Sequence, residues 1–310
     1  MIYPWLRQVS AEFEERVRGG RLPHALLLTG PAGTGQSELA AAFIIRLLCL
    51  EPSDGACGQC RSCRLLGSGA HPDHRLVTFE EHPRTGEMRR EIVVEQIRRL
   101  TAALTLTTTV SVRKSALIFP AVAMNRNAAN ALLKTLEEPP GDTVLLLISH
   151  DPARLPATIR SRCQNLNVRM PERHEALQWL RRAADADEGD AAVALEAAAG
   201  SPLAALEVLQ AGETETYRMV KSTLADLANK RTDAAGALGV LSEVEAKILW
   251  RWLSLAAAER QRAIAAAGRA SRPLAELQQS ADHGRKLLET PVRKDFLLQD
   301  WLIQWARLSA

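Results

Sequence analysis

The sequence predicts an α/β domain with a parallel sheet, followed by a small helical lid domain and an all-α C-terminal domain. Two observations indicate this fold class. Short apolar runs alternate with amphipathic helical patterns over about the first 165 residues, as in a parallel sheet covered by helices. After Met170-Pro171 we find no strand pattern, only Ala- and Leu-rich helical periodicity. We therefore expect domains at residues 1–168, 169–211 and 212–310.

The α/β domain is predicted to open with a strand at residues 24–29 that runs into a glycine-rich loop. An amphipathic helix starts at Ser37, because Leu39, Phe43 and Leu47 follow at helical spacing. Further strands are expected at Leu76–Phe79, Ser115–Phe119, Thr143–Ser149 and Leu166–Val168, with helices at Val93–Leu104 and Asn127–Glu138.

The helical remainder is interrupted at Gly200-Ser201-Pro202 and near Gly212, which sets the expected limits of the lid domain. The last predicted helix carries an apolar stripe at helical spacing, formed by Leu297, Leu298, Trp301, Leu302 and Trp305. Such a stripe is typical of the core of a helical bundle. A contact face for another subunit is the alternative interpretation.

Composition excludes several classes of protein. Hydrophobic residues make up 46% and charged residues 24% of the chain, a balance that argues against disorder. With 39 basic and 36 acidic residues the net charge is only +3, so bulk charge does not indicate a nucleic-acid coat or a membrane-surface protein. No apolar stretch approaches the ~18 residues of a membrane span, and the N-terminus lacks the apolar segment of a secretory signal. We expect a cytoplasmic protein without a membrane partner.

The glycine-rich loop differs at one position from the phosphate-binding pattern G-x-x-x-x-G-K-[ST]. Gly30, Gly33 and Gly35 would let backbone N–H groups turn toward a phosphate, and Ser37 could hold Mg²⁺. The lysine that neutralises the phosphates is replaced by Gln36, which brings no charge to phosphoryl transfer. We expect a degenerate P-loop that is empty or does not support hydrolysis.

A nucleotide hydrolase of this type also needs an acidic residue at the end of a later strand, where it holds Mg²⁺. The matching strand, Ser115–Phe119, runs into residues 120–124, which contain no Asp or Glu. Two independent losses therefore predict that the chain does not hydrolyse nucleotide.

Four of the five cysteines crowd together in a C-x₇-C-x₂-C-x₂-C pattern: Cys49, Cys57, Cys60 and Cys63. Thiolates at this spacing can converge on one zinc ion, and four of them leave no open position, so a structural site is predicted. His71 and His74 lie nearby and are expected to support the module rather than bind the metal. Cys163 stands apart as a small core residue.

Two longer runs make a family resemblance specific. Residues 128–140, AANALLKTLEEPP, and residues 155–163, LPATIRSRC, resemble the signature of clamp-loader subunits of the AAA+ superfamily. The opening Tyr3-Pro4-Trp5-Leu6 and the run Pro23-His24-Ala25 narrow the resemblance to one type of bacterial subunit. The match covers the first 205 residues well and the C-terminal hundred only by helical character and length.

The resemblance implies an AAA+-like P-loop domain within a pentameric ring, where the C-terminal domain serves oligomerisation as a collar. The implied partners are the motor subunits gamma/tau and a delta subunit, with the sliding clamp and primer-template DNA reached through the complex. In this family the Arg of a Ser-Arg-Cys motif completes a neighbour's ATP site, which assigns that role to Arg162 within Ser161-Arg162-Cys163. A zinc module is also implied. Leu203 occupies the position of a helical sensor Arg of the motors.

We therefore expect a non-hydrolysing subunit of a replicative polymerase holoenzyme that donates Arg162 in trans and is not catalytic by itself. One alternative is an ATP-hydrolysing motor of the same family that tolerates Gln36, which predicts tight Mg-ATP binding. The other is a zinc-dependent nucleic-acid-binding adaptor outside the ring, which predicts DNA affinity that falls steeply with salt.

Overall fold

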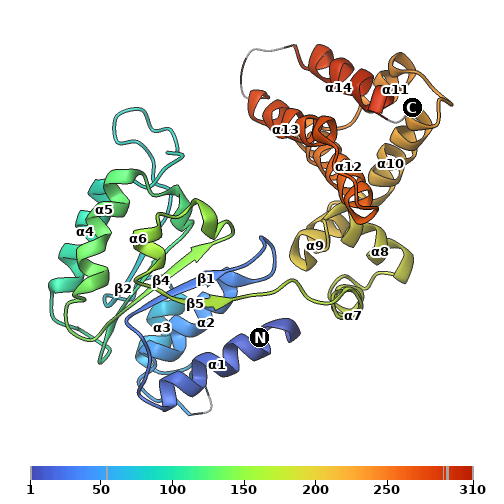
Figure 1. Cartoon of the computed structure of the whole chain (residues 1–310). Helices are drawn as coiled ribbons and strands as arrows, with labels where there is room; N and C mark the ends of the chain where they lie inside the picture. The colour runs from blue at the N-terminus through green and yellow to red at the C-terminus, as the bar shows by residue number, and fades with distance from the viewer. Residues whose placement is uncertain (1, 54, 289, 291–292, 309–310) are drawn as a thin grey trace. The chain divides into compact units, whose positions relative to one another are not determined.

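The computed structural model describes residues 2–53, 55–288, 290 and 293–308, so the outer limits of the predicted domains, residues 1 and 310, lie outside the described part. The chain forms two compact units, Met1–Glu175 and Ala176–Ala310 (Figure 1). The first unit holds a five-stranded sheet, as predicted. Its strands are β1 (Ala25–Thr29), β2 (His74–Val77), β3 (Lys114–Ile118), β4 (Thr143–Ser149) and β5 (Gln164–Asn167).

All strand pairs in the sheet are parallel, in the order β2-β3-β4-β1-β5. The buried strands β1 and β4 lie side by side, with Thr29 opposite Ser149 at their carboxyl ends. Every residue of both strands is buried, which explains their continuous apolar runs. The predicted α/β class with a parallel sheet is confirmed.

Helices cover both faces of the sheet (Figure 1). One face packs against α4 and α5, and the other against α1 and α2, each through its own apolar cluster. The helices of this unit are η1 (Pro4–Leu6), α1 (Arg7–Arg18), α2 (Gln36–Leu48), α3 (Arg61–Gly67), α4 (Val94–Thr105), η2 (Ala121–Ala123), α5 (Arg126–Glu137), η3 (Pro152–Arg154) and α6 (Ala157–Arg160).

The ends of the helices near the candidate site follow from local sequence. Asn125 begins α5, because its side chain accepts a hydrogen bond from the Ala128 N–H at 2.9 Å. The helix ends before Pro139-Pro140, which cannot continue a helical hydrogen-bond ladder. The end of α5 is thereby fixed at Glu137.

The described residues after Asn167 contain helices and no strand. These helices share one apolar core, which includes the predicted stripe residues Leu298, Trp301, Leu302 and Trp305. The division into a lid and a C-terminal domain at residue 211 stays a prediction. The helices are α7 (Arg173–Ala184), α8 (Glu188–Ala197), α9 (Pro202–Gln210), α10 (Thr214–Ala228), α11 (Ala234–Leu241), α12 (Ala246–Ala266), α13 (Arg272–Leu287) and α14 (Lys294–Leu308).

Within the described ranges, no single helix is long and apolar enough to cross a membrane. Only α8 and α9 taken together reach that length and composition, and they are bent by 115° at the break between them.

Candidate functional site

The glycine loop connects β1 to α2 at the carboxyl end of the sheet. Gly30, Gly33 and Gly35 all have positive φ angles, of 142°, 73° and 91°, a conformation that favours glycine. A Cβ atom at Gly30 would lie 2.1 Å from the carbonyl oxygen of Val168. The chain therefore keeps the tight strand-to-helix turn that its glycines predict.

Gln36 is turned into the loop. Its side chain is 2% exposed, and its Nε2 donates a hydrogen bond to the Pro31 carbonyl at 2.8 Å. The Thr34 hydroxyl donates to the same carbonyl at 2.9 Å. The amide at the lysine position therefore holds the loop's own backbone, whereas Ser37, the candidate Mg²⁺ ligand, is exposed in the first turn of α2.

An aromatic pair from the N-terminus packs on the same loop. The Trp5 indole N–H donates to the Thr34 carbonyl at 2.8 Å, and the rings of Tyr3 and Trp5 stack with centroids 5.1 Å apart. A Cβ atom at Gly35 would lie 2.6 Å from the Tyr3 ring. Burial, with Glu38 nearby, raises the pKa of Tyr3. Sequence reasoning missed this contact; the glycine at position 35 was its only local signal.

The carboxyl end of β3 carries no acid. Ile118 is followed by Phe119, Pro120 and the short helix η2. At the end of the neighbouring β4, the buried Ser149 hydroxyl has no hydrogen-bond partner among the described residues. A neutral hydroxyl cannot replace the carboxylate that holds Mg²⁺ in a P-loop hydrolase.

The Ser-Arg-Cys motif follows α6 on the side of the sheet covered by α5. The Cys163 side chain packs against that apolar cluster, and burial raises the pKa of its thiol to about 11. The Arg162 side chain remains 34% exposed and forms an ion pair with Glu137. Ser161 is exposed and its hydroxyl donates to the Thr158 carbonyl. In this motif Arg162 is therefore accessible at the surface, while the next residue, Cys163, packs against the core.

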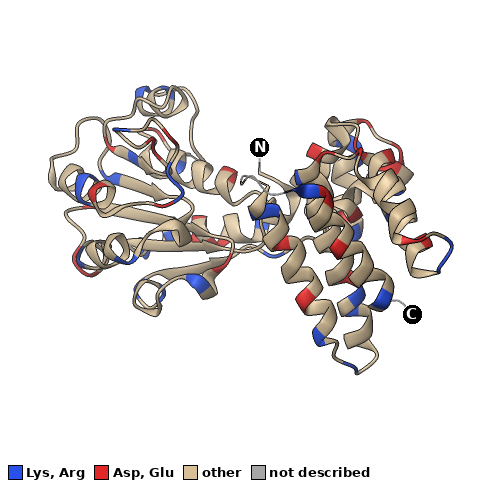
Figure 2. Cartoon of the chain, turned by 90° about the horizontal axis from the view of Figure 1, so that it is seen from above, with Lys and Arg blue, Asp and Glu red and all other residues tan. Residues whose placement is uncertain are grey.

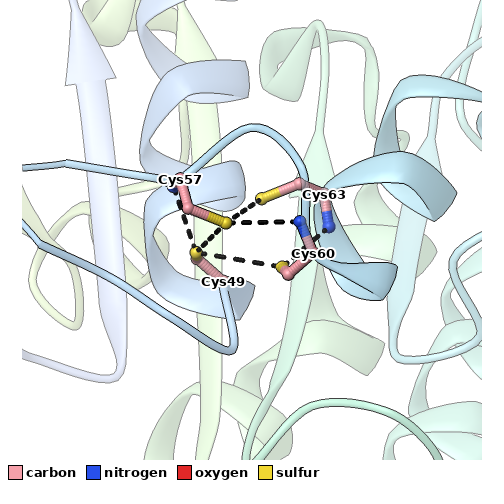
Figure 3. A group of neighbouring side chains, drawn as sticks. All are labelled: Cys49, Cys57, Cys60 and Cys63. Atoms are coloured by element: carbon pink, nitrogen blue, oxygen red, sulfur yellow. Dashed lines mark hydrogen bonds between the residues drawn. The ribbon is translucent and has the colours of Figure 1, made fainter.

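The four predicted zinc ligands converge (Figure 3). Their Sγ atoms all lie within 4.8 Å of one another, with Cys49 3.5 Å from Cys57. Cys49 and Cys60 are 4.0 Å apart, as are Cys57 and Cys63. Zinc bound tetrahedrally at about 2.3 Å would separate its sulfur ligands by about 3.8 Å, so the four thiols fit this ion. Residue 54 of the predicted module 49–63 lies outside the described residues.

Local structure brings the cysteines together. Cys49 directly follows α2, and Cys60 and Cys63 belong to the start of α3. Backbone N–H groups of Cys57, Cys60 and Cys63 donate to the sulfurs of Cys49, Cys57 and Cys60 at 3.3 to 3.5 Å. Such donors favour the thiolate form that binds metal.

The thiols shift each other's pKa in opposite directions: they lower that of Cys60 and raise that of Cys63. Burial disfavours the Cys60 thiolate, but hydrogen bonds from the backbone N–H groups of Cys63 and Leu50 and from the thiols of Cys63 and Cys57 lower the pKa of Cys60 to about 6. Burial and the bond to Cys60 raise the pKa of Cys63. A divalent cation would relieve the repulsion among the four thiolates.

A buried polar network connects the cysteine module to the sheet. The His71 ring lies 2.9 Å from the Ser62 hydroxyl on α3 and 3.2 Å from Ser111, whose hydroxyl donates to the Leu48 carbonyl. The Asp73 carboxylate accepts the N–H groups of residues 109, 110 and 111 at 2.7 to 2.9 Å. His71 thus supports the module rather than joining the thiol cluster. His74 lies on β2 beside Ser115.

Together, the parallel α/β unit, the glycine-rich loop after its first strand and the helical unit define a class: P-loop-type proteins that combine a sheet unit with a helical unit. The family model described as DNA polymerase III, delta subunit, matches residues 5–172. DNA polymerase III subunit delta' of Pseudomonas aeruginosa is 40% identical over 255 residues, which are 81% of this chain and 74% of that protein. The Escherichia coli subunit delta' is 33% identical over 253 residues, with the same shares covered. The chain therefore belongs to the family of bacterial DNA polymerase III delta-prime subunits.

Among solved structures, a DNA polymerase III gamma subunit-related protein from Thermotoga maritima aligns with 99% of this chain and 100% of its own, at 14% identity and a TM-score of 0.46.

Proposed function

We propose that this chain is a clamp-loader subunit of the DNA polymerase III holoenzyme that does not hydrolyse nucleotide and donates Arg162 to ATP on a neighbouring subunit. It thereby helps to load the sliding clamp onto primed DNA. The observation that carries the proposal is a contrast between two sites in one unit. Arg162 lies at the surface in its motif, whereas Gln36 is folded into the chain's own phosphate loop.

The chemistry of Arg162 suits a role in trans. A guanidinium is always charged and offers a planar set of donors that matches a phosphate. Placed at a water-poor subunit interface, such an arginine finger is worth about 10³–10⁵ in the rate of phosphoryl transfer. The chain's own loop has no comparable group, because the lysine position is Gln36 and no acid follows β3. Leu203, at the sensor position on α9, adds no charge either.

The proposed partners follow from the relatives. Those named above are delta' subunits, and subunit tau/gamma of Haemophilus influenzae is 33% identical over 53% of this chain. We therefore place this chain beside gamma/tau motor subunits and a delta subunit, with the clamp and primer-template DNA reached through the complex. A bacterial replication complex of this kind assembles in the cytoplasm.

The cysteine cluster is proposed to hold one structural zinc ion. Cys49, Cys57, Cys60 and Cys63 would occupy all four tetrahedral positions, so no open position would remain for substrate or water. The metal would join the end of α2 to α3 and stabilise this part of the fold.

The test is the DNA- and clamp-stimulated ATPase of a reconstituted loader in which only this subunit carries Arg162→Ala. At the site that this subunit completes, we expect turnover to fall by about 10³–10⁵, and clamp loading to fall with it while the ring stays assembled. Arg154→Ala is a matched control, because Arg154 is an exposed arginine eight positions earlier on the same segment.

Unchanged ATPase in an intact ring would contradict the role of Arg162. Turnover of ATP by the purified subunit alone, abolished by Gln36→Ala, would instead favour a motor. The adaptor alternative has little electrostatic support, because acidic and basic residues are interspersed over both units (Figure 2).

A further inference from the structure

The Arg162 guanidinium is already engaged within its own chain. Its Nε donates to Glu137 Oε1 at 2.7 Å, and its Nη2 forms an ion pair with the same oxygen. Its Nη1 donates to the Thr158 carbonyl at 3.1 Å and to the Ser161 hydroxyl at 3.3 Å. All three nitrogens therefore have partners on α5 and α6.

This engagement limits what Arg162 can offer to a phosphate. A guanidinium carries five N–H donors, and these contacts use four of them. Two-point recognition of a phosphate oxygen pair requires two parallel N–H groups. Arg162 can present such a pair only if Glu137 releases it, because Glu137 holds Nε–H and one Nη2–H.

The position of Glu137 at the end of α5 directs its carboxylate to Arg162. It is the last residue of α5, whose buried side includes Leu132, Thr135 and Leu136, while the Glu137 side chain is 50% exposed. Within the described chain, the Glu137 carboxylate accepts its hydrogen bonds from Arg162.

We infer that Glu137 masks Arg162 and acts as a built-in brake on the trans-acting finger; this rests on the function proposed above. The carboxylate neutralises the guanidinium and would repel a neighbour's phosphate. Because both partners are partly exposed, the pair is weak and reversible. A phosphate group on the neighbouring subunit can therefore displace Glu137 from Arg162.

The test uses the assembled loader without DNA or clamp, and compares kcat for ATP in complexes that differ only in this subunit. Glu137→Gln keeps the shape and one acceptor but removes the charge, and Glu137→Ala removes both. We expect kcat to rise by about two- to fivefold, the range available from an exposed ion pair, and to rise more for the Ala variant. Glu12→Gln is the matched control, because Glu12 also pairs with an arginine and is 47% exposed.

The expected rise in kcat must depend on Arg162. In the double variant Glu137→Ala/Arg162→Ala, we expect kcat to equal that of Arg162→Ala alone, which a merely structural role of Glu137 would not produce. The proposal that Glu137 masks Arg162 would be contradicted by an unchanged or reduced kcat in both Glu137 variants. It would also be contradicted by a rise in kcat that persists in the double variant. If Arg162→Ala itself had no effect, the proposed function would fail as well, so the two failures are distinguishable.

Discussion

His74 shows how a single half-buried side chain makes the stability of the first unit depend on pH. Its ring lies on β2 with Nδ1 2.8 Å from the Ser115 hydroxyl on the adjacent β3. Burial is the largest cause that lowers the pKa of His74 to about 4, with the nearby His71 and Arg75 acting in the same direction. In the unfolded chain the pKa of histidine is about 6.5. The unfolded state therefore binds more protons between these two values, and stability is lost as the pH falls through this window.

We expect the free energy of unfolding to decrease by about 1 kcal/mol between pH 7.5 and 5.5 because of His74 alone. Urea unfolding of the wild type and of His74→Asn at both pH values measures this decrease. Any release of metal at low pH affects both proteins, so it cancels in the difference between their free energies of unfolding. The difference in free energy of unfolding between the wild type and His74→Asn should be smaller by about 1 kcal/mol at pH 5.5 than at pH 7.5. If this difference in free energy of unfolding were the same at both pH values, His74 would not titrate in this window.

At the scale of single residues, the sequence predicted sites whose residues lie close together along the chain. The four cysteines lie within fifteen positions, and their spacing alone was enough to place them in one cluster. The stacking of Tyr3 over Gly35 and the pairing of Glu137 with Arg162 join residues that only the folded sheet brings together. The spacing of residues along the sequence does not identify such pairs.

Among the elements, the loop between α2 and α3 depends most on the proposed metal. It contains few apolar residues, and its cluster consists of the cysteines with Ile45 and Ala56. We expect Cys57→Ser to reduce bound zinc from one ion per chain to well below one and to lower the thermal midpoint of the first unit, because metal binding and folding are coupled.

Elemental analysis of purified protein and thermal unfolding measure the two effects of Cys57→Ser. Cys163→Ser is the control, because this cysteine lies outside the cluster and packs against the core beside α5. Equal zinc content in the Cys57 and Cys163 variants would show that the cluster does not bind the ion.

The five strands of the sheet were predicted, and the differences arise at their ends. The apolar run at Leu76–Phe79 predicts a strand, whereas β2 spans His74–Val77. Pairing with β3 begins with His74 opposite Ser115, so backbone hydrogen bonds rather than apolar side chains define this strand. Leu76 is 57% exposed on this edge strand. In β4, which is buried on both faces, the predicted and observed limits coincide, and in the equally buried β1 they differ by one residue.

At the scale of the whole molecule, the two units have separate apolar cores and divide after Glu175, whereas the composition of the sequence changes after residue 170. The single core shared by the helices that the structure describes in the second unit was not predicted, because helical periodicity identifies apolar faces but not the helices that they meet. The expected boundary at residue 211 falls between α9 and α10, within the span of that core.

Separate cores predict that removal of the metal weakens one unit only. The proposed zinc site belongs to the first unit, whereas five of the six tryptophans, Trp179, Trp250, Trp252, Trp301 and Trp305, belong to the second. After treatment with a strong chelator, we expect the part of the far-UV circular dichroism transition that reports on the sheet unit to move to lower temperature. The midpoint observed by tryptophan fluorescence should stay where it was.

Adding zinc back should restore the first transition, which separates loss of the metal from irreversible damage. The physical reason for the asymmetry is that a ligand bound to the folded form stabilises only the cooperative unit that binds it. A fluorescence midpoint that fell together with the circular dichroism signal would mean that the units unfold as one. The metal site would then stabilise the helical unit as well as the sheet unit that contains Arg162.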